Sequence, residues 1–204
     1  MIRAIIFDLD NTLLDFVKMK QFAVKASIRA MNEAGLNVDE ESGYEDVMEL
    51  YMTTGWENQL VFDDYLKQTT GEVSNKILAA GVVAYRRARE ATLLVYPNVN
   101  KTLIELLKAQ IRLAVVSDAP SREAWMRLYY LNLHHVFDPV LTFDDTGARK
   151  PSPKPFKLAL DRMNVGPDEA LMIGDWPDRD VVGAKQILSL IHISEPTRLL
   201  AWGM

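Results

Sequence analysis

The chain has 204 residues, of which 49% are hydrophobic and 25% are charged, a composition typical of a soluble globular protein. A formal net charge of -5 disfavours nucleic acid as a general partner, and the lack of cysteine excludes disulfides and thiolate catalysis. The N-terminus shows no signal-peptide pattern, and no apolar stretch is long enough to cross a bilayer. We therefore expect a cytoplasmic protein without a membrane partner.

The first apolar run, at residues 4–7, ends in two carboxylates. Its sequence Ala-Ile-Ile-Phe is short, β-branched and aromatic, as expected of a strand buried on both faces. Alternation along the chain places Asp8 and Asp10 on the same side. Two acids this close repel each other unless a cation lies beside them, so the stretch suggests a metal and a nucleophile. The plain alternative is that both acids are turn residues that stop a strand.

Four amphipathic segments follow without a strand between them. Apolar residues recur at helical spacing from Phe16 to Met31, and Gly35 ends the pattern. Further helices are predicted at residues 44–52, 57–65 and 74–94. The interval 16–94 is therefore predicted to be a small helical bundle inserted into a sheet domain, which consists of residues 1–15 and 95–187.

The second half alternates strands with helices. The pattern predicts helices at 99–109, 121–132, 156–163 and 181–186, and strands at 111–116, 137–143 and 170–174. Such alternation is typical of a parallel sheet with right-handed crossovers. The predicted fold class is therefore α/β, with a Rossmann-like parallel core.

Three predicted strands end in polar residues, which parallel strands would bring to one edge of the sheet. Besides the first strand, the second ends at Ser117 and Asp118 and the fourth at Asp175. Lys150 lies in a loop stiffened by two prolines, and further acids follow Asp175 closely. A carboxylate cluster, a hydroxyl and a fixed lysine suit a metal-bound phosphoryl group. Ligands that are all oxygen favour magnesium over zinc.

Four motifs together resemble the haloacid dehalogenase-like superfamily of phosphohydrolases with a helical cap after the first motif. They are Asp-Leu-Asp-Asn-Thr-Leu at 8–13, the strand ending in Ser-Asp at 117–118, Lys-Pro-Ser-Pro at 150–153, and Gly-Asp-Trp-Pro-Asp-Arg-Asp at 174–180. The match covers residues 1 to about 187. Each motif is weak alone, but four in this order and spacing are specific.

The resemblance implies the catalytic and phosphate-binding roles. Asp8 is the nucleophile that forms an aspartyl-phosphate, and Asp10 is the general acid and then the general base. The residues expected to bind the phosphoryl group are Ser117, Asp118 and Lys150. Lys154 is a nearby rival, but Lys150 holds the family's lysine-proline-x-proline register.

The resemblance also implies a magnesium cofactor. Its ligands would be Asp8, the carbonyl of Asp10, and Asp175. Asp180 and Thr12 would support this site from outside the ligand set. One departure is Trp176, which stands where the family often has serine.

Residues 188–204 do not continue the pattern of the superfamily, which would add a further strand and a last helix. The sequence Leu-Ser-Leu-Ile-His-Ile-Ser-Glu-Pro-Thr-Arg at 188–198 resembles the in-frame translation of a sequencing-library adapter. We therefore expect a non-native tail. Its β-prone start could still pair with the edge of the strand at 170–174. A divergent natural C-terminus is the alternative.

The sequence thus predicts a magnesium-dependent phosphatase that hydrolyses a small phosphate monoester. The nearest resemblance is to archaeal-type members and to phosphoglycolate or glyceraldehyde-phosphate phosphatases. A phosphomutase with the same residues and a truncated inactive fragment remain alternatives, whereas a dehalogenase would not need Asp10. The expected partner is a small phosphorylated metabolite, and the protein would be a monomer or a homodimer.

Overall fold

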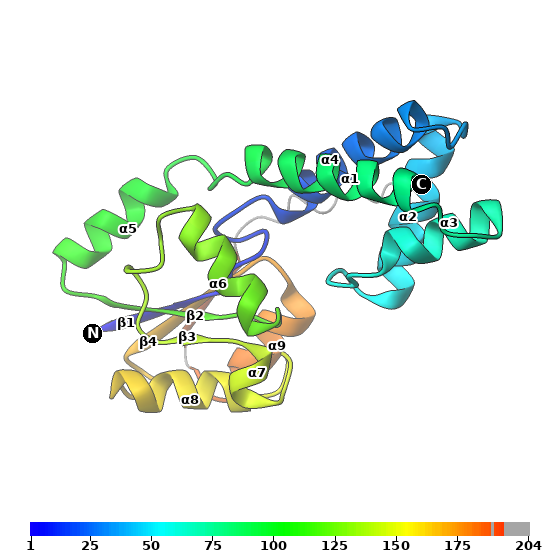
Figure 1. The fold of residues 1–204 in the computed structure, drawn as a ribbon. Coiled ribbons are helices and arrows are strands. Elements are labelled where there is room, and N and C mark those ends of the chain that lie inside the picture. The colour runs from blue at the N-terminus through cyan, green and yellow to red at the C-terminus, as the bar shows by residue number, and fades with distance from the viewer. Residues whose placement is uncertain (189, 194–204) are drawn as a thin grey trace. The chain divides into compact units, whose positions relative to one another are not determined.

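The structure, a computed structural model, describes residues 1–188 and 190–193 (Figure 1). The chain divides into two compact units. The sheet unit comprises Met1–Asp15 and Leu94–Met204, and the helical unit comprises Phe16–Leu93. The helical unit is thus an insertion in the chain of the sheet unit, and each is described separately below.

The sheet unit is built on a parallel sheet. Its described strands are β1 (Ala4–Phe7), β2 (Arg112–Val116), β3 (Val140–Leu141), β4 (Ala170–Gly174) and β5 (Leu190–Ile193). They lie in the order β3-β2-β1-β4-β5, and every neighbouring pair is parallel. The predicted α/β class is therefore confirmed, with β1 at the centre because its apolar residues suit burial on both faces.

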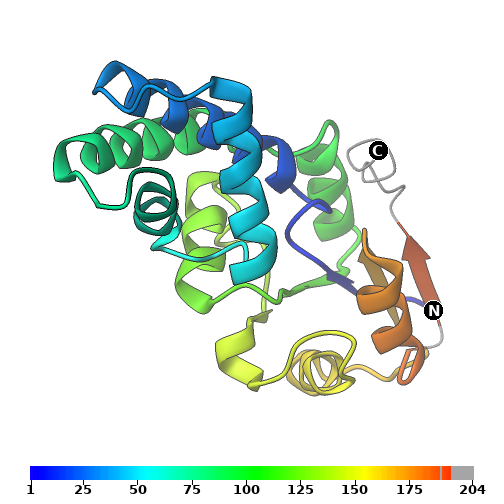
Figure 2. The same cartoon turned by 90° about the vertical axis from the view of Figure 1, so that its right-hand side faces the viewer.

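Helices cover both faces of this sheet. They are α5 (Val99–Lys108), α6 (Ser121–Tyr130), α7 (Phe143–Thr146), α8 (Lys154–Met163) and α9 (Val182–Lys185), with a π-helical turn η1 at Pro177–Val181. Figures 1 and 2 show α5 and α6 on one face and α8 on the other. On the α8 face, alternate strand residues such as Ile6 and Met172 pack with Phe156 in a buried core.

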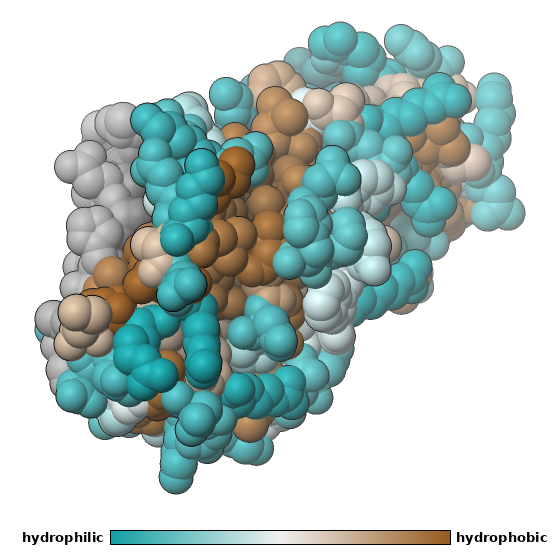
Figure 3. Space-filling view, turned by 90° about the vertical axis from the view of Figure 1, so that its left-hand side faces the viewer, coloured by the Kyte–Doolittle hydropathy of each residue, from teal (hydrophilic) through white to brown (hydrophobic). Residues whose placement is uncertain are grey.

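The opposite face of the sheet is covered less evenly. Ile5 and Val115 are buried there, whereas Leu171 and Ile173 on β4 are only half-buried. The side of the sheet unit nearest the reader in Figure 3 carries an apolar area. Exposed apolar side chains such as Ile104 of α5 occur in this unit. On the α8 face, by contrast, the β4 residue Met172 is fully buried.

The third strand is shorter than predicted. The apolar pattern predicted residues 137–143, but only Val140 and Leu141 pair with β2. The chain turns into α7 because Thr142 caps it: the Thr142 hydroxyl and backbone N–H both donate to Asp145 Oδ2, at 2.6 and 2.8 Å. A local capping box thus overrides the strand pattern.

The segment after α9 forms the edge strand β5. It pairs with β4 in parallel register from Leu171–Leu190 to Gly174–Ile193. This confirms the expectation that the segment can occupy that edge. The prediction that residues 188–204 are non-native remains a prediction, and residues 189 and 194–204 lie outside the described part of the chain.

The helical unit contains four helices, as its periodicity predicted. They are α1 (Phe16–Glu33), α2 (Glu40–Thr54), α3 (Val61–Thr70) and α4 (Asn75–Thr92). α3 begins later than the predicted residue 57 because Asn58 Oδ1 accepts the Leu60 N–H at 2.8 Å and holds a turn there. Among the described helices of the whole chain, none has the length and apolarity needed to span a membrane.

Helices α1 and α4 approach each other closely at Gly81. A Cβ on Gly81 would lie 2.8 Å from Ser27 Oγ and would overlap the end of the Met31 side chain. Both of these neighbours are buried on α1. A larger residue at position 81 must therefore push the helices apart or displace Met31.

We expect Gly81→Val to destabilise the protein by about 1–3 kcal/mol, because the core between α1 and α4 would be overpacked. Ala79→Val, which introduces the same valine side chain at an exposed position of α4, is the matched control. Thermal unfolding of both variants measures the difference. Equal losses of stability in the two variants would show that the close approach of α1 and α4 does not restrict the size of the residue at position 81.

Candidate active site

The parallel sheet gathers the predicted site residues at one edge. Asp8 follows β1, and its backbone N–H donates to the Ile173 carbonyl at 2.9 Å, so it is held beside β4. Ser117 follows β2 and donates its N–H to the Leu141 carbonyl at 2.9 Å. Asp175 follows β4. The carboxyl ends of three neighbouring strands thus meet, as parallel pairing requires.

Lys150 reaches into this cluster from the loop before α8. Its ammonium forms ion pairs with Asp8 Oδ1 and, at 2.7 Å, with Asp180 Oδ1. The side chain is 4% exposed, so these pairs are shielded from water. Lys154, the alternative considered from the sequence, is exposed at the start of α8. The structure therefore places Lys150, and not its rival, beside the acids.

Three buried carboxylates form one cluster, and two of them pair with that ammonium. One carboxylate oxygen from each of Asp8, Asp175 and Asp180 lies within 4.8 Å of the others. With one lysine among three acids, the cluster carries a formal charge of -2 when all groups are ionised. Burying uncompensated charge costs free energy, so further positive charge would stabilise the cluster. All the ligand atoms that the three side chains offer are oxygen. The residues therefore fit a hard divalent cation such as magnesium.

Gly174 allows Asp180 to enter the cluster. A Cβ on Gly174 would lie 2.7 Å from the Asp180 Cβ and would overlap its carboxyl group. Asp180 is further fixed by the Trp176 backbone N–H, which donates to Oδ2 at 2.9 Å. The glycine at the end of β4 therefore makes room for the acid that follows six residues later.

Burial and charge shift the pKa values of the central pair. Burial raises the pKa of Asp8 well above its usual value, and Asp180, Asp175 and Asp10 raise it further, although Lys150 opposes them. Burial alone would lower the pKa of Lys150, but the carboxylates of Asp8, Asp180 and Asp118 raise it above its usual value. Lys150 is therefore a permanent cation, whereas Asp8 needs more positive charge nearby to ionise fully.

Three polar residues surround the central cluster. The Thr12 hydroxyl lies 3.4 Å from Asp8 Oδ2, as a donor to the carboxylate. Ser117 is buried, and its Oγ accepts the Ala119 N–H at 3.2 Å. Asp118 Oδ1 accepts the backbone N–H of Lys150 at 2.8 Å. The Asp118 carboxylate therefore holds the loop that carries Lys150, a contact that the sequence did not predict.

Two arginines near the site were missed by sequence analysis. Arg127 Nη1 donates to Asp10 Oδ2 at 2.9 Å. The guanidinium of Arg179 lies 4.0 Å from the centre of the Trp176 ring and 3.4 Å from Asp118 Oδ2. A signal existed for Arg127, because it interrupts the buried face of the predicted helix 121–132 with a cation. Arg179 lies within the motif at 174–180, but nothing in that motif indicates its contacts with Trp176 and Asp118.

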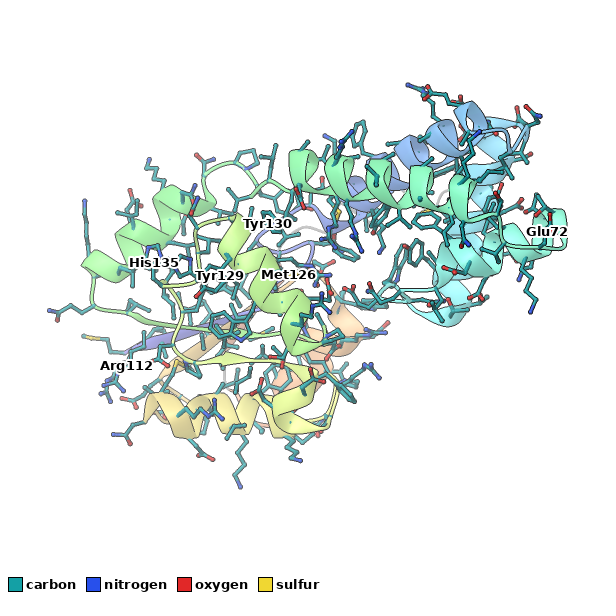
Figure 4. All side chains as sticks on the ribbon, viewed as in Figure 1. Glu72, Arg112, Met126, Tyr129, Tyr130 and His135 are labelled. Atoms are coloured by element: carbon teal, nitrogen blue, oxygen red, sulfur yellow. The ribbon has the colours of Figure 1, made fainter. Side chains whose placement is uncertain are left out.

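A surface hollow on α6 lies apart from these acids. It has a volume of about 530 Å³, and its lining residues are Arg122, Trp125, Met126, Tyr129 and Tyr130. Figure 4 shows Met126, Tyr129 and Tyr130 along α6. The lining contains neither a carboxylate nor a histidine, so the hollow lacks the side chains that usually bind a metal ion.

A family model described as haloacid dehalogenase-like hydrolase matches residues 2–187. The chain belongs to the haloacid dehalogenase-like hydrolase family. It is 37% identical over 188 residues to the glyceraldehyde 3-phosphate phosphatase of Methanopyrus kandleri, covering 91% of this chain and 81% of that one. It is 31% identical over 203 residues to the phosphoglycolate phosphatase of Aquifex aeolicus, covering 98% and 85%. These matches confirm the predicted enzyme class, a phosphoric monoester hydrolase.

Solved structures share the fold of this hydrolase. A putative β-phosphoglucomutase from Thermotoga maritima superimposes with a TM-score of 0.73 at 23% identity, covering 98% of this chain and 91% of that one. A haloacid dehalogenase-like phosphatase from Thermococcus onnurineus gives a TM-score of 0.69 at 23% identity, covering 100% and 91%. At these identities the likeness concerns the fold alone.

We expect magnesium to stabilise the protein, because it would neutralise the buried acids. At a hundred times its dissociation constant, bound magnesium would add about 2.7 kcal/mol to the free energy of unfolding. Asp175→Asn should lose most of this gain, whereas Asp178→Asn, which changes an exposed acid on η1, should keep it. Thermal unfolding with magnesium and with a chelator tests this expectation. Equal gains in both variants would contradict it.

Proposed function

We propose that this hydrolase is a magnesium-dependent phosphatase of small phosphate monoesters that works through an aspartyl-phosphate on Asp8. One observation carries the proposal: a lysine is buried between Asp8 and Asp180 at the carboxyl edge of the sheet. This arrangement supplies a nucleophile together with a cation that can hold phosphoryl oxygens.

In the first half of the reaction, an Asp8 carboxylate oxygen attacks phosphorus, and the bond from phosphorus to the leaving oxygen breaks. Asp10 donates its proton to that oxygen, so the product leaves as an alcohol. The Lys150 ammonium and the Ser117 hydroxyl bind the equatorial phosphoryl oxygens. Asp118 contributes through the Lys150 loop that it holds, and Thr12 orients the Asp8 carboxylate.

In the second half, Asp10 accepts a proton from a water molecule, whose oxygen attacks phosphorus while the bond to Asp8 breaks. Free phosphate and both original side chains are restored. Magnesium would be held by Asp8, Asp175 and the Asp10 carbonyl, with Asp180 beside them. When bound, it supplies the positive charge that reduces repulsion between a carboxylate and an anionic substrate.

The proposed substrates are small phosphorylated sugars and acids. Relatives that share 33–37% of their residues with this chain are named glyceraldehyde 3-phosphate phosphatases. Relatives at 30% and 31% identity are named ribulose-1,5-bisphosphate 5-phosphatase and phosphoglycolate phosphatase. The substrates in all these names are small molecules that carry phosphate monoester groups. We infer that the helical unit acts as a cap that selects among such substrates.

Asp8→Asn should reduce turnover by at least about a thousandfold, because an amide of nearly the same shape is a poor nucleophile. Phosphate release from glyceraldehyde 3-phosphate in the presence of magnesium measures this loss. Asp161→Asn, at an exposed position of α8, serves as the control and should match the wild type. An Asp8→Asn protein with more than a few per cent of wild-type turnover would rule out the nucleophile.

The effect of Asp10→Asn on the first half-reaction should depend on the leaving group of the substrate. An aryl phosphate with an acidic phenol needs little protonation and should still phosphorylate Asp8. With alkyl phosphates, whose alkoxide leaving groups need a proton, the rate of alcohol release should fall about 100-fold or more. Rapid-quench measurement of alcohol release from both substrate types decides this point. Equal losses on the two types would contradict the role of Asp10 as an acid.

A further inference from the structure

The site contains a second buried cation whose partner is the proposed acid. Arg127 lies on α6 with its side chain 7% exposed, and its Nη1 is 2.9 Å from Asp10 Oδ2. The Asp10 side chain is 23% exposed, so the pair lies at the border between the core and the site. The two residues are 117 positions apart in the chain, and tertiary structure alone brings them together.

The position of Arg127 on its helix is unusual for a charged residue. Its buried neighbours on α6 are the apolar Ala124 and Leu128 and the acidic Glu123, whereas Arg122 of the same helix is exposed. An apolar residue would fill a core-facing position at less desolvation cost. Buried ion pairs contribute little net stability compared with apolar replacements of similar volume. The pair is therefore better explained by what it does to Asp10 than by stability.

An arginine is well suited to fix a carboxylate. Its planar guanidinium is rigid and always charged, so a contact with one carboxylate oxygen also limits rotation of the group. Asp10 lies three residues after the end of β1, and the backbone at Asn11 turns sharply with φ +60°. Backbone and guanidinium together define where the Asp10 carboxylate points.

We propose that Arg127 is a positioning residue, which holds Asp10 Oδ2 so that Oδ1 faces the leaving group and exchanges the proton. This inference rests on the proposed function, because it concerns how Asp10 acts in that reaction. In the first step the Oδ1 proton passes to the leaving oxygen as the bond to phosphorus breaks. In the second step a proton from water returns to Oδ1 as the bond between phosphorus and Asp8 breaks.

The test compares Arg127→Met with Arg127→Lys and with Arg122→Met, which removes an exposed cation from the same helix. On an alkyl phosphate, Arg127→Met should lower kcat about 10- to 100-fold with less than a threefold change in KM. Single-turnover release of nitrophenolate from 4-nitrophenyl phosphate should fall less than threefold. Arg127→Lys should recover much of the alkyl activity, and Arg122→Met should match the wild type.

A double-mutant cycle separates positioning from a general structural role. If Arg127 acts through Asp10, Arg127→Met should cost less than twofold when added to Asp10→Asn. The Lys variant provides the same cycle if the Met variant does not fold. Equal losses on both substrates, or additive losses in the cycle, would overturn the proposal.

Failure of the wider function has a different signature. If the wild type hydrolysed neither substrate with magnesium, the proposed phosphatase and this inference would fall together. If the wild type were active and Arg127→Met behaved like it, only the positioning role would fall.

Discussion

The structure of the site depends on one electrostatic constraint, the burial of three carboxylates beside a single ammonium. Asp8, Asp175 and Asp180 cannot all remain ionised in that place without positive charge. Lys150 supplies part of it through pairs with Asp8 and Asp180, and a divalent cation would balance the remainder. The same excess of negative charge that attracts a metal would repel a phosphate ester, so in the proposed mechanism Lys150 and a divalent cation would together offset that repulsion.

Backbone features place each charge in this cluster. Parallel pairing of β1 with β2 and β4 brings the strand ends together, and Gly174 leaves the space that the Asp180 carboxyl group occupies. Asp118 holds the backbone of Lys150 and thereby fixes the loop from which the ammonium extends. Asp8 and Asp175 therefore follow directly on rigid strands, Asp180 lies on the turn η1, and a short loop tied to the end of β2 carries the lysine.

The helical unit has a different internal organisation. Its core is formed by apolar residues of its own helices, including Ile28, Tyr65 and Leu66. Lys20 is buried within it, 2.8 Å from the Tyr85 hydroxyl and 4.0 Å from the centre of the Tyr51 ring. A unit with its own core is able to move as one body, which suits the proposed capping role.

The sequence alone determined the α/β class, the inserted helices and the positions of the strand-end acids, because hydrophobic periodicity and local residue types encode them. It also favoured Lys150 over Lys154, through the register of its motif. Tertiary structure decided the contacts between segments far apart in the chain. A cation on the buried face of α6 marked Arg127 in the sequence, but no local pattern identified Asp10 as its partner or joined Asp118 to the Lys150 backbone. Only the assembled sheet brings those residues into contact, since distant segments meet through packing and strand register.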